Sequence, residues 1–542
     1  MWRLERSPAE GRSKGSTPDM RALISVYDKS GILDFATGLR ELDVTILATD
    51  GTYEFLTENG IDVEPVSSVT DYPEILGGRV KTLHPAIFGA ILCDRSSQEH
   101  NAALAEHEIE PIDLVVVNLY PFVDVVSRGG VGRDEAIEFI DIGGAALIRA
   151  AAKNHRDVTP VVDPEDYEDV LAELYRYRAN KDKTRRRLAA KAFAHTSAYD
   201  AYVTSFFSNE DEERFPPAFT VPLYKIQDLR YGENLHQRAA LYADTPRSKE
   251  LRQPSTVATA LQLHGKALSF NNLLDCDAAW SMVTDFSAPA AAVVKHTNPT
   301  GIAAGKDLKE AYLRAFAGDP QAAYGGIVGV NRTMDEATAE EIVRMYFEAV
   351  VAPDFTDAAV QVLSRKKAIR LLSVRADGEG PLQDVSWIEY HNLDFKRIDG
   401  GFLIQSRNAA SDLSMNMQVV SKRQPTLEEL TDLHFAWRAV KHVKSNGIVL
   451  AKKLALVGVG AGQMSRVNAV DLAVRMAGDR SHGSVLASDA YFPFPDGVER
   501  AVEAGVTAII QPGGSIRDKD AIEAADRGAV AMIFTGLRHF KH

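Results

Sequence analysis

The sequence predicts an α/β protein with a doubly wound parallel sheet in its first half and a duplicated α/β unit in its second half. In the first half, an apolar run at residues 22–26 precedes a helical pattern over residues 32–42, and this alternation repeats along the chain. In the second half, residues 294–302 align without gaps to residues 440–448, with five of nine positions identical. Because 542 residues exceed what a single hydrophobic core organises, two or more domains are expected.

Four buried strands are expected in the first half, each followed by a small polar cluster. They are residues 22–26, 44–48, 114–118 and 158–162. The carboxyl ends of parallel strands meet at one edge of a sheet, where doubly wound folds bind ligands. We therefore expect the polar clusters to form one site. A basic helix from Lys181 to Lys191 ends this half.

The domain boundary is expected in residues 206–222, which are rich in acidic residues and proline. Residues 1–19 are polar, lack the apolar centre of a secretory signal and are expected to form a disordered tail. The sequence thus predicts a first domain over residues 20–217 and a second over residues 218–542.

The duplication in the second half has a second indication. Residues 350–354 match residues 485–489, in the same order along the chain as the first pair of segments. A chance match is the alternative. A duplicated domain would form a site between its two halves or across a dimer interface.

Composition excludes several classes of function. The formal net charge of −14 argues against binding to nucleic acid or to an anionic membrane. No apolar run approaches the roughly 18 residues that a membrane span needs. The two cysteines, Cys93 and Cys276, form no CxxC pair, so we expect no disulfide framework, no thiolate zinc site and a reducing compartment such as the cytoplasm. No HExxH motif occurs, and acid–base catalysis without a metal is expected.

Three clusters in the first half have the composition of phosphate-binding loops. Residues 28–31 and 49–52 place hydroxyl groups and a glycine where a strand turns into a helix, and residues 79–85 add two cations. Helix N-termini bind phosphate through free N–H groups. The alternative is ordinary helix capping, but three clusters in one domain favour a phosphorylated small molecule.

Lys153 closes a motif that begins at Asp141 and contains two glycines and three consecutive alanines. The glycines open the backbone to a ligand. The alternative is a lysine that offsets the dipole at a helix C-terminus. Tyr120 follows a predicted strand and is either a phenol at the same rim or a packed aromatic side chain.

Lys295 and His296 form the most informative pair. A neighbouring ammonium keeps an imidazole neutral near pH 7, so the histidine can accept a proton while the lysine stabilises a developing oxyanion. Transfer of an acyl or formyl group to a weak amine needs this combination. The two side chains serve one site only if the backbone turns, and Asn298-Pro299 with Gly301 is the expected break. The alternative is a solvated pair at a strand end.

Residues 458–462 resemble a dinucleotide loop, but no acidic residue follows at the required place, so an anion- or ring-binding loop with Arg466 is expected instead.

Together these motifs resemble the bifunctional AICAR formyltransferase / IMP cyclohydrolase family of purine biosynthesis. The resemblance covers residues 21–542 and rests on Arg79 to Pro85, Asn118 to Phe122, Arg149 to His155, Leu229 to Asn234, Lys295-His296, Gly460 to Gln463 with Arg466, and Leu537 to Phe540. It implies a methylglyoxal-synthase-like first domain and two cytidine-deaminase-like subdomains without zinc. It also implies a homodimer with formyl-transfer sites at the subunit interface, and 10-formyltetrahydrofolate as co-substrate.

The resemblance implies two catalytic sets. His296 would deprotonate the 5-amino group of AICAR, and Lys295 would stabilise the transition state as formyl leaves the folate. Lys153 would transfer protons as formyl-AICAR closes to IMP with loss of water, supported by Tyr120 and Asp141. The positions that match AICAR or folate contacts are Arg230, Tyr231, Gly325, Asp354, Asn446, Arg466, Tyr491, Asp496 and Arg538. The positions that match the nucleotide-binding loops are Tyr27, Asp28, Lys29, Thr49, Asp50, Gly51, Thr52, Arg79, Lys81, Thr82 and Asn118.

The chain departs from the family pattern at a few places. Tyr324 and Tyr491 stand where many relatives carry phenylalanine. Lys541 precedes His542, which leaves the role of the terminal histidine open. Lys441-His442 is interpreted as a structural remnant. Two rival interpretations are a non-catalytic nucleotide-sensing protein and a zinc nucleoside deaminase. The catalytic sets argue against the first, and the missing cysteines argue against the second.

Overall fold

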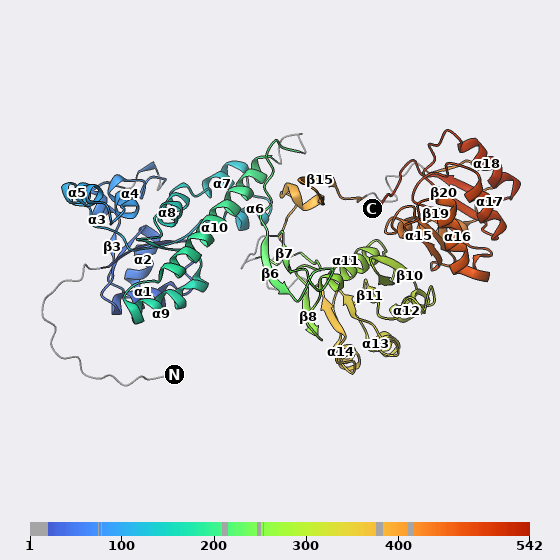
Figure 1. Ribbon diagram of the computed structural model, residues 1–542, viewed down its shortest axis with the longest axis horizontal. Helices are drawn as coiled ribbons and strands as arrows, with labels where there is room; N and C mark the ends of the chain where they lie inside the picture. The colour runs from blue at the N-terminus through green and yellow to red at the C-terminus, as the bar shows by residue number, and fades with distance from the viewer. Residues whose placement is uncertain are drawn as a thin grey trace. The chain divides into compact units, whose positions relative to one another are not determined.

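The computed structural model describes residues 20–73, 75–76, 79–208, 215–245, 251–252, 254–375, 383–409 and 417–542 (Figure 1). The predicted tail, residues 1–19, lies outside the described residues. The chain divides into two compact units. Unit 1 comprises Met1–Pro222 and Asp384–His391, and unit 2 comprises Leu223–Gln383 and Asn392–His542. The return of residues 384–391 to unit 1 has no counterpart in the division expected from the sequence.

Unit 1 contains a five-stranded, wholly parallel sheet in the order β3-β2-β1-β4-β5. Its strands are β1 (Arg21–Val26), β2 (Thr45–Ala48), β3 (Glu64–Pro65), β4 (Leu114–Asn118) and β5 (Thr159–Val161). The four predicted strands are confirmed, and β3 is an additional edge strand. The order of the strands reverses between β1 and β4, so the carboxyl ends of these two strands flank the expected binding crevice.

Helices cover both faces of this sheet (Figure 1). Alternate residues of each strand point to opposite faces, so Ala22 and Ile24 pack with α1 and α9, while Leu23 packs with α4, α8 and α10. The helices of unit 1 are α1 (Ile32–Glu41), α2 (Asp50–Glu58), α3 (Ser67–Thr70), α4 (Pro85–Leu92), α5 (Gln98–Glu106), α6 (Phe122–Ser127), α7 (Arg133–Glu138), α8 (Ile142–Lys153), α9 (Tyr167–Tyr177) and α10 (Asp182–Ser208), with a 3₁₀ turn at Pro164–Asp166.

Unit 2 contains two six-stranded mixed sheets with the same order and the same strand directions. The first is β10-β9-β11-β12-β13-β8 and the second is β18-β17-β19-β20-β21-β16. The predicted duplication is therefore confirmed. Both copies contribute to one hydrophobic core, in which Phe286 and Phe435 pack with their ring centroids 5.2 Å apart.

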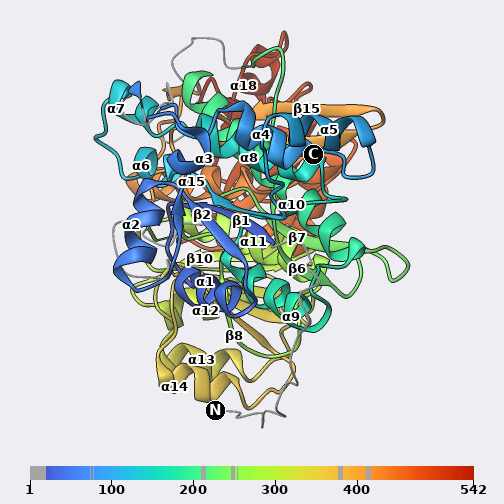
Figure 2. The same ribbon diagram turned by 90° about the vertical axis from the view of Figure 1, so that its left-hand side faces the viewer.

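The first copy consists of β8 (Leu261–His264), α11 (Phe270–Thr284), β9 (Ala290–Lys295), β10 (Asn298–Ala304), α12 (Leu308–Phe316), β11 (Ile327–Val330), α13 (Glu336–Ile342), β12 (Ala349–Ala352), α14 (Asp357–Leu363) and β13 (Arg370–Ser373). The second consists of β16 (Gln418–Val419), α15 (Leu427–Val440), β17 (Ile448–Ala451), β18 (Leu456–Gly460), α16 (Arg466–Ala477), β19 (Val485–Ser488), α17 (Asp496–Glu503), β20 (Ala508–Gln511), α18 (Asp518–Arg527) and β21 (Ala531–Phe534). Two hairpins accompany them, β6 (Tyr224–Leu229) with β7 (Ala239–Ala243) and β14 (Leu393–Ile398) with β15 (Gly401–Ser406). Helices α13 and α14 lie side by side in both views (Figures 1 and 2).

The sequence alignment that suggested the duplication is wrong in register. Residues 294–302 span the end of β9 and most of β10, whereas residues 440–448 run from the end of α15 to the start of β17. The strand order pairs β9 with β17 and β12 with β20, so the match of residues 350–354 in β12 with residues 485–489 in β19 is also shifted. The counterpart of Lys441-His442 is consequently not the Lys295-His296 pair.

The backbone identifies the true counterpart of Lys295 as Lys452. In the first copy, Asp275 accepts hydrogen bonds from the backbone N–H groups of the turn after β9, and in the second copy Asp432 accepts the same two bonds from the turn after β17. Each aspartate is the sixth residue of its helix. The ammonium of Lys452 donates to the carbonyl of His482, which precedes β19 as Tyr324 precedes β11.

Candidate active sites

A cavity of about 900 Å³ lies in unit 1 at the carboxyl ends of β1, β2 and β4. It is lined by all but one of the residues predicted to bind the nucleotide, together with Tyr120 and Asp141. The predicted residues are Tyr27, Lys29, Thr49, Asp50, Gly51, Thr52, Arg79, Lys81, Thr82 and Asn118. The remaining one, Asp28, is not among the lining residues, but its backbone is hydrogen-bonded to Asn118, which is. The polar clusters after separate strands therefore line one cavity, as expected from a parallel sheet.

Asn118 fixes the loop after β1. Its side-chain oxygen accepts from the backbone N–H groups of Tyr27 at 2.5 Å and Asp28 at 3.0 Å, and its amide donates to the carbonyl of Asp28 at 2.9 Å. The rings of Tyr27 and Tyr120 meet edge to face with centroids 5.8 Å apart. Both rings are partly exposed, so they form an aromatic wall of the cavity.

Two lysines bring positive charge into the cavity. Burial lowers the pKa of Lys29; the Asp28 carboxylate opposes this effect and the Lys81 ammonium adds to it. Lys29 donates to the carbonyl of Val26 and to the Thr52 hydroxyl. Lys81 lies 3.6 Å from a carboxylate oxygen of Asp50, at the N-terminus of α2.

Asp141 caps α8 and faces the same cavity. Its carboxylate accepts from the backbone N–H of Gly144 at 2.7 Å. A Cβ atom at Gly144 would lie 2.4 Å from this carboxylate, so any larger residue would displace it. Burial raises the pKa of Asp141, and the backbone N–H groups of Gly144 and Tyr120 and the Lys81 ammonium act in the opposite direction. The result is a carboxyl group that holds a proton more readily than a solvated one.

The structure does not bring Lys153 to this cavity. Lys153 is the last residue of α8, whereas the cavity is lined by Asp141, Ile142 and the two glycines at the start of that helix. Eleven residues at about 1.5 Å each separate the two ends by roughly 16 Å. Among the described residues that line the cavity, Lys81 and Lys29 are the lysines present. Lys153 is therefore not placed with Tyr120 and Asp141, because the length of α8 separates them, and its catalytic role stays a prediction.

Lys295 and His296 lie at a tight hairpin between β9 and β10. His296 and Thr297 both have positive φ, 53° and 61°, as a two-residue turn requires. The turn therefore occurs two residues before the expected break at Asn298-Pro299. Asp275 of α11 holds it by accepting the backbone N–H of Thr297 at 2.6 Å and that of His296 at 3.4 Å. Burial raises the pKa of Asp275, whereas these two bonds lower it.

The Lys295 ammonium is directed by a backbone carbonyl. It donates to the oxygen of Tyr324 at 2.9 Å. The next residue, Gly325, has a φ of +73°, which turns the Tyr324 carbonyl toward the lysine at little cost for glycine. The rings of Tyr324 and Tyr346 lie 5.3 Å apart and are substantially exposed.

The second copy of unit 2 brings two of the predicted residues together. Arg466 donates to the side-chain oxygen of Asn446 at 2.6 Å and also pairs with the fully buried Asp489 at 2.5 Å. Arg466 itself is 7% exposed. The guanidinium of Arg466 thus neutralises a buried carboxylate and orients Asn446, and its role as an anion partner stays a prediction.

The other predicted residues of unit 2 are distributed over several elements. Asp354 pairs with Arg375 at 3.1 Å and lines a second cavity of about 430 Å³ with Trp280. The guanidinium groups of two arginines lie near neighbouring rings, Arg230 near Tyr231 and Arg538 near Phe540. Tyr491 is 42% exposed, and Asp496 begins α17.

Sequence reasoning missed several residues that shape these sites. Asp275 and Asp489 hold the two polar clusters of unit 2, yet both are single carboxylates in helical or strand-end segments without a motif. Among the described residues, no group of three or more His, Cys, Asp or Glu side chains is placed to hold a metal ion. The helices of the described chain include none long and apolar enough to cross a membrane.

Comparison with known proteins identifies the family. A family model described as "AICARFT/IMPCHase bienzyme" matches residues 151–476, and one described as "MGS-like domain" matches residues 31–146. The bifunctional purine biosynthesis protein PurH of Thermoanaerobacter sp. (strain X514) is 49% identical over 522 residues, which cover 96% of this chain and 99% of the relative. The chain belongs to the AICARFT/IMPCHase bienzyme family.

Further relatives agree with this family. The PurH proteins of Bacillus subtilis (strain 168) and Anoxybacillus flavithermus (strain DSM 21510 / WK1) are 49% and 50% identical, each over 96% of this chain and 99% of the relative. A solved structure, described as the crystal structure of ForH, is 38% identical, covers 35% of this chain and 97% of its own, and has a TM-score of 0.33. As a member of the bienzyme family, the chain is an AICAR formyltransferase and IMP cyclohydrolase that carries out the last two steps of IMP synthesis. This excludes the interpretation as a non-catalytic nucleotide sensor.

Proposed function

We propose that the two activities of the bienzyme are divided between the units: the unit 1 cavity closes formyl-AICAR to IMP, and the Lys295-His296 turn of unit 2 transfers the formyl group. The single observation that carries this division is the convergence of Asp141, Lys81 and Tyr120 on one cavity of unit 1, whereas the Lys295 turn belongs to unit 2. Each set has the groups that its own reaction needs and draws on residues of one unit.

The phosphate of the nucleotide is proposed to bind at the N-terminus of α2. Thr49 and Gly51 line the cavity there, and a Cβ atom at Gly51 would meet nothing within 4 Å, so the backbone is open to a ligand. Backbone N–H groups at a helix N-terminus bind anions. Lys29, partly buried and adjacent, supplies further positive charge.

Ring closure joins the carboxamide nitrogen of formyl-AICAR to its formyl carbon and then expels water. We assign stabilisation of the oxygen that gains negative charge to Lys81, because this ammonium faces the cavity and acts on Asp141. Asp141, whose pKa is raised by burial, is assigned the proton transfers, from the attacking nitrogen and to the departing hydroxyl. Tyr120 donates its backbone N–H to Asp141, and its ring lines the same cavity. Lys153, for which the family resemblance implied this role, lies at the C-terminus of α8 and is assigned no part in ring closure.

Formyl transfer requires the 5-amino nitrogen of AICAR to attack the formyl carbon of the folate. The bond from that carbon to N10 breaks, the amine loses a proton and N10 of tetrahydrofolate gains one. We assign the deprotonation to His296 and stabilisation of the tetrahedral oxyanion to Lys295, which the tight turn places in adjacent positions. The family implies a formyltetrahydrofolate donor, and 10-formyltetrahydrofolate is the proposed one.

The proposed arrangement is a cytoplasmic homodimer with formyl-transfer sites completed by both subunits. Two observations support it: Cys93 and Cys276 are buried, unpaired thiols, as in a reducing compartment, and the predicted contacts of unit 2 are spread over several elements. Analytical ultracentrifugation should give twice the 59.3 kDa of one chain, and dilution should reduce formyl transfer before cyclisation. A monomer with full formyl-transfer activity contradicts the proposal.

Supplied formyl-AICAR tests the cyclisation site directly. We expect Lys81→Ala to lower its rate of closure about 100-fold or more, as loss of an oxyanion-stabilising group does. Lys153→Ala serves as the matched control and should retain most of the activity, since its side chain lies at the other end of α8. If Lys153→Ala abolishes closure and Lys81→Ala does not, the assignment reverts to Lys153.

A further inference from the structure

The ion pair between the buried Arg370 and the partly exposed Glu348 takes no direct part in the proposed reaction. Arg370 begins β13, is 4% exposed, and donates to a carboxylate oxygen of Glu348 at 2.5 Å. The backbone N–H of Arg370 and its guanidinium also donate to the Glu348 carbonyl, at 3.1 and 3.3 Å. A buried guanidinium is costly to desolvate, so an arginine with three bonds to one residue is held in a single geometry.

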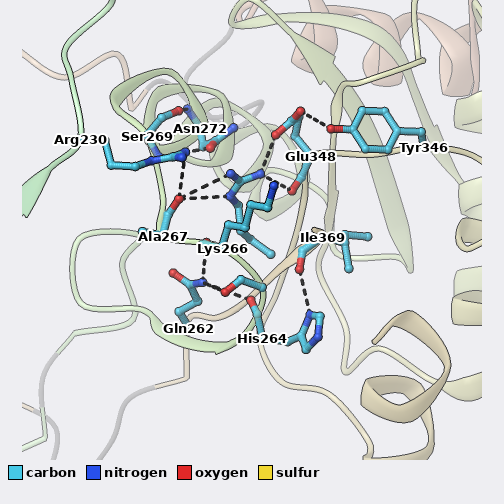
Figure 3. Close-up of polar contacts among 12 residues, drawn as sticks. Arg230, Gln262, His264, Lys266, Ala267, Ser269, Asn272, Tyr346, Glu348 and Ile369 are labelled. Carbon is cyan, nitrogen blue, oxygen red and sulfur yellow. Dashed lines mark hydrogen bonds and ion pairs between the residues drawn. The ribbon is translucent and has the colours of Figure 1, made fainter. Parts of the chain in front are cut away.

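One branch of this pair extends to Lys295. The second carboxylate oxygen of Glu348 accepts from the hydroxyl of Tyr346, as Figure 3 shows. The Tyr346 ring, fixed in this way, packs against the ring of Tyr324, and the Tyr346 carbonyl accepts from the Gly325 N–H at 2.9 Å. The peptide between Tyr324 and Gly325 is thus fixed on both sides. Its carbonyl is the acceptor of the Lys295 ammonium.

The other branch extends to Arg230. The guanidinium of Arg370 lies 3.4 and 3.5 Å from the carbonyl oxygen of Ala267, and Arg230 donates to the same oxygen at 3.4 Å (Figure 3). This carbonyl is itself held in place, because Gln262 donates to the carbonyls of the preceding loop residues, including Lys266 at 2.8 Å. Two arginines therefore share one backbone acceptor at the edge of the first copy.

We infer that Arg370 and Glu348 are positioning residues for formyl transfer, orienting Lys295 through Tyr346 and Arg230 through the Ala267 carbonyl. The inference deepens the proposed function and rests on its assignment of Lys295 and Arg230. Arg370 is too buried to meet a substrate, so it acts only through these neighbours. The pKa of the Tyr346 phenol is raised, first by its hydrogen bond to Glu348 and then by burial, which is consistent with a firmly held hydroxyl.

The two branches predict different kinetic signatures. Tyr346→Phe removes only the hydroxyl that fixes the ring and should lower kcat for formyl transfer about tenfold or more, with little change in KM for AICAR, since misplacing a catalytic group has effects of this size. Arg370→Lys disturbs both branches, because it also loses the contact with the Ala267 carbonyl that orients Arg230. It should therefore raise KM for AICAR in addition to lowering kcat. Glu348→Gln, which keeps the shape of the side chain, should lie between wild type and Tyr346→Phe. Cyclisation of supplied formyl-AICAR should stay unchanged in all three variants.

The control is Tyr242→Phe, which removes the hydroxyl of a tyrosine that is 47% exposed in β7. It should behave as wild type. A double-mutant cycle separates positioning from loss of stability: in a Lys295→Ala background, Tyr346→Phe should reduce the residual single-turnover rate no further. An additive effect overturns the inference. If Lys295→Ala transfers formyl normally, the proposed function is wrong. If Lys295→Ala is inactive while Tyr346→Phe and Arg370→Lys keep wild-type kcat and KM, only the inference about positioning is wrong.

Discussion

Replacing Trp387 by alanine should destabilise unit 1 although Trp387 lies in a segment between two parts of unit 2. Its ring contacts Phe122 and Tyr202 edge to face, with centroids 6.4 and 6.2 Å apart, and its indole N–H donates to the Ser127 hydroxyl at 3.0 Å. The neighbouring Asp384 donates its backbone N–H to the Ser127 carbonyl at 2.9 Å. Residues 384–391 thus supply an aromatic side chain to the core beside α6 and α10.

The magnitude follows from burial. Trp387 is 7% exposed, and Phe122, Ser127 and Tyr202 are at most 1% exposed. Truncating a buried tryptophan to alanine costs about 3–5 kcal/mol, which includes the cavity left behind. Trp387→Phe keeps much of the ring but leaves the Ser127 hydroxyl without the indole, which should cost about 1–2 kcal/mol. Because α6 begins at Phe122, close after Tyr120, cyclisation should be lost at lower urea concentration in both variants.

The assay is urea unfolding monitored by retention of cyclisation activity and by hydrogen exchange of β1 and β4. Tyr72→Ala is the control, since Tyr72 is 54% exposed in the same unit. The expected order of midpoints is wild type and Tyr72→Ala, then Trp387→Phe, then Trp387→Ala. A midpoint for Trp387→Ala equal to that of Tyr72→Ala refutes the reasoning that this segment completes the core.

Two further predictions concern stability and the cyclisation site. Burial lowers the pKa of His539 to about 4 from 6.5, helped by the nearby Lys441 ammonium. The folded state resists the proton that the unfolded state accepts, so the contribution of His539 to the free energy of unfolding should be full above pH 6.5 and fall by about 3 kcal/mol as the pH drops toward 4. Urea titrations at several pH values should show a flatter pH profile of stability for His539→Gln. A profile equal to that of wild type argues against the buried neutral imidazole. Gly144→Ala places a Cβ atom against the Asp141 carboxylate, so it should impair closure of formyl-AICAR while formyl transfer continues. Equal rates of closure in wild type and variant contradict the role assigned to Asp141.

Local patterns predicted the fold of unit 1 and most of the polar residues that line its cavity. The strands are continuous apolar runs, and parallel pairing then forces the polar residues after β1, β2 and β4 onto one edge. The distance of Lys153 from Asp141 could not be predicted, because a motif gives order along the chain but not distance, and α8 separates the two residues. The segment around Trp387 could not be predicted, since a return of the chain to an earlier unit leaves no periodic signal in the sequence.

The duplication shows a different limit. The five identical positions between residues 294–302 and residues 440–448 pointed to a real repeat, but this alignment matched a hairpin with a helix end. What the copies share is a backbone device, in which Asp275 and Asp432 each cap a tight turn from the sixth position of a helix. The residues within those turns differ, so identity could not find the register.

The most direct test of the two-site account follows tetrahydrofolate and IMP separately after AICAR, 10-formyltetrahydrofolate and enzyme are mixed. Lys295→Ala should release no tetrahydrofolate yet close supplied formyl-AICAR at the wild-type rate. Lys81→Ala should release tetrahydrofolate at the wild-type rate and accumulate formyl-AICAR. A folded variant of either kind that loses both activities together contradicts the division of the two reactions between the units.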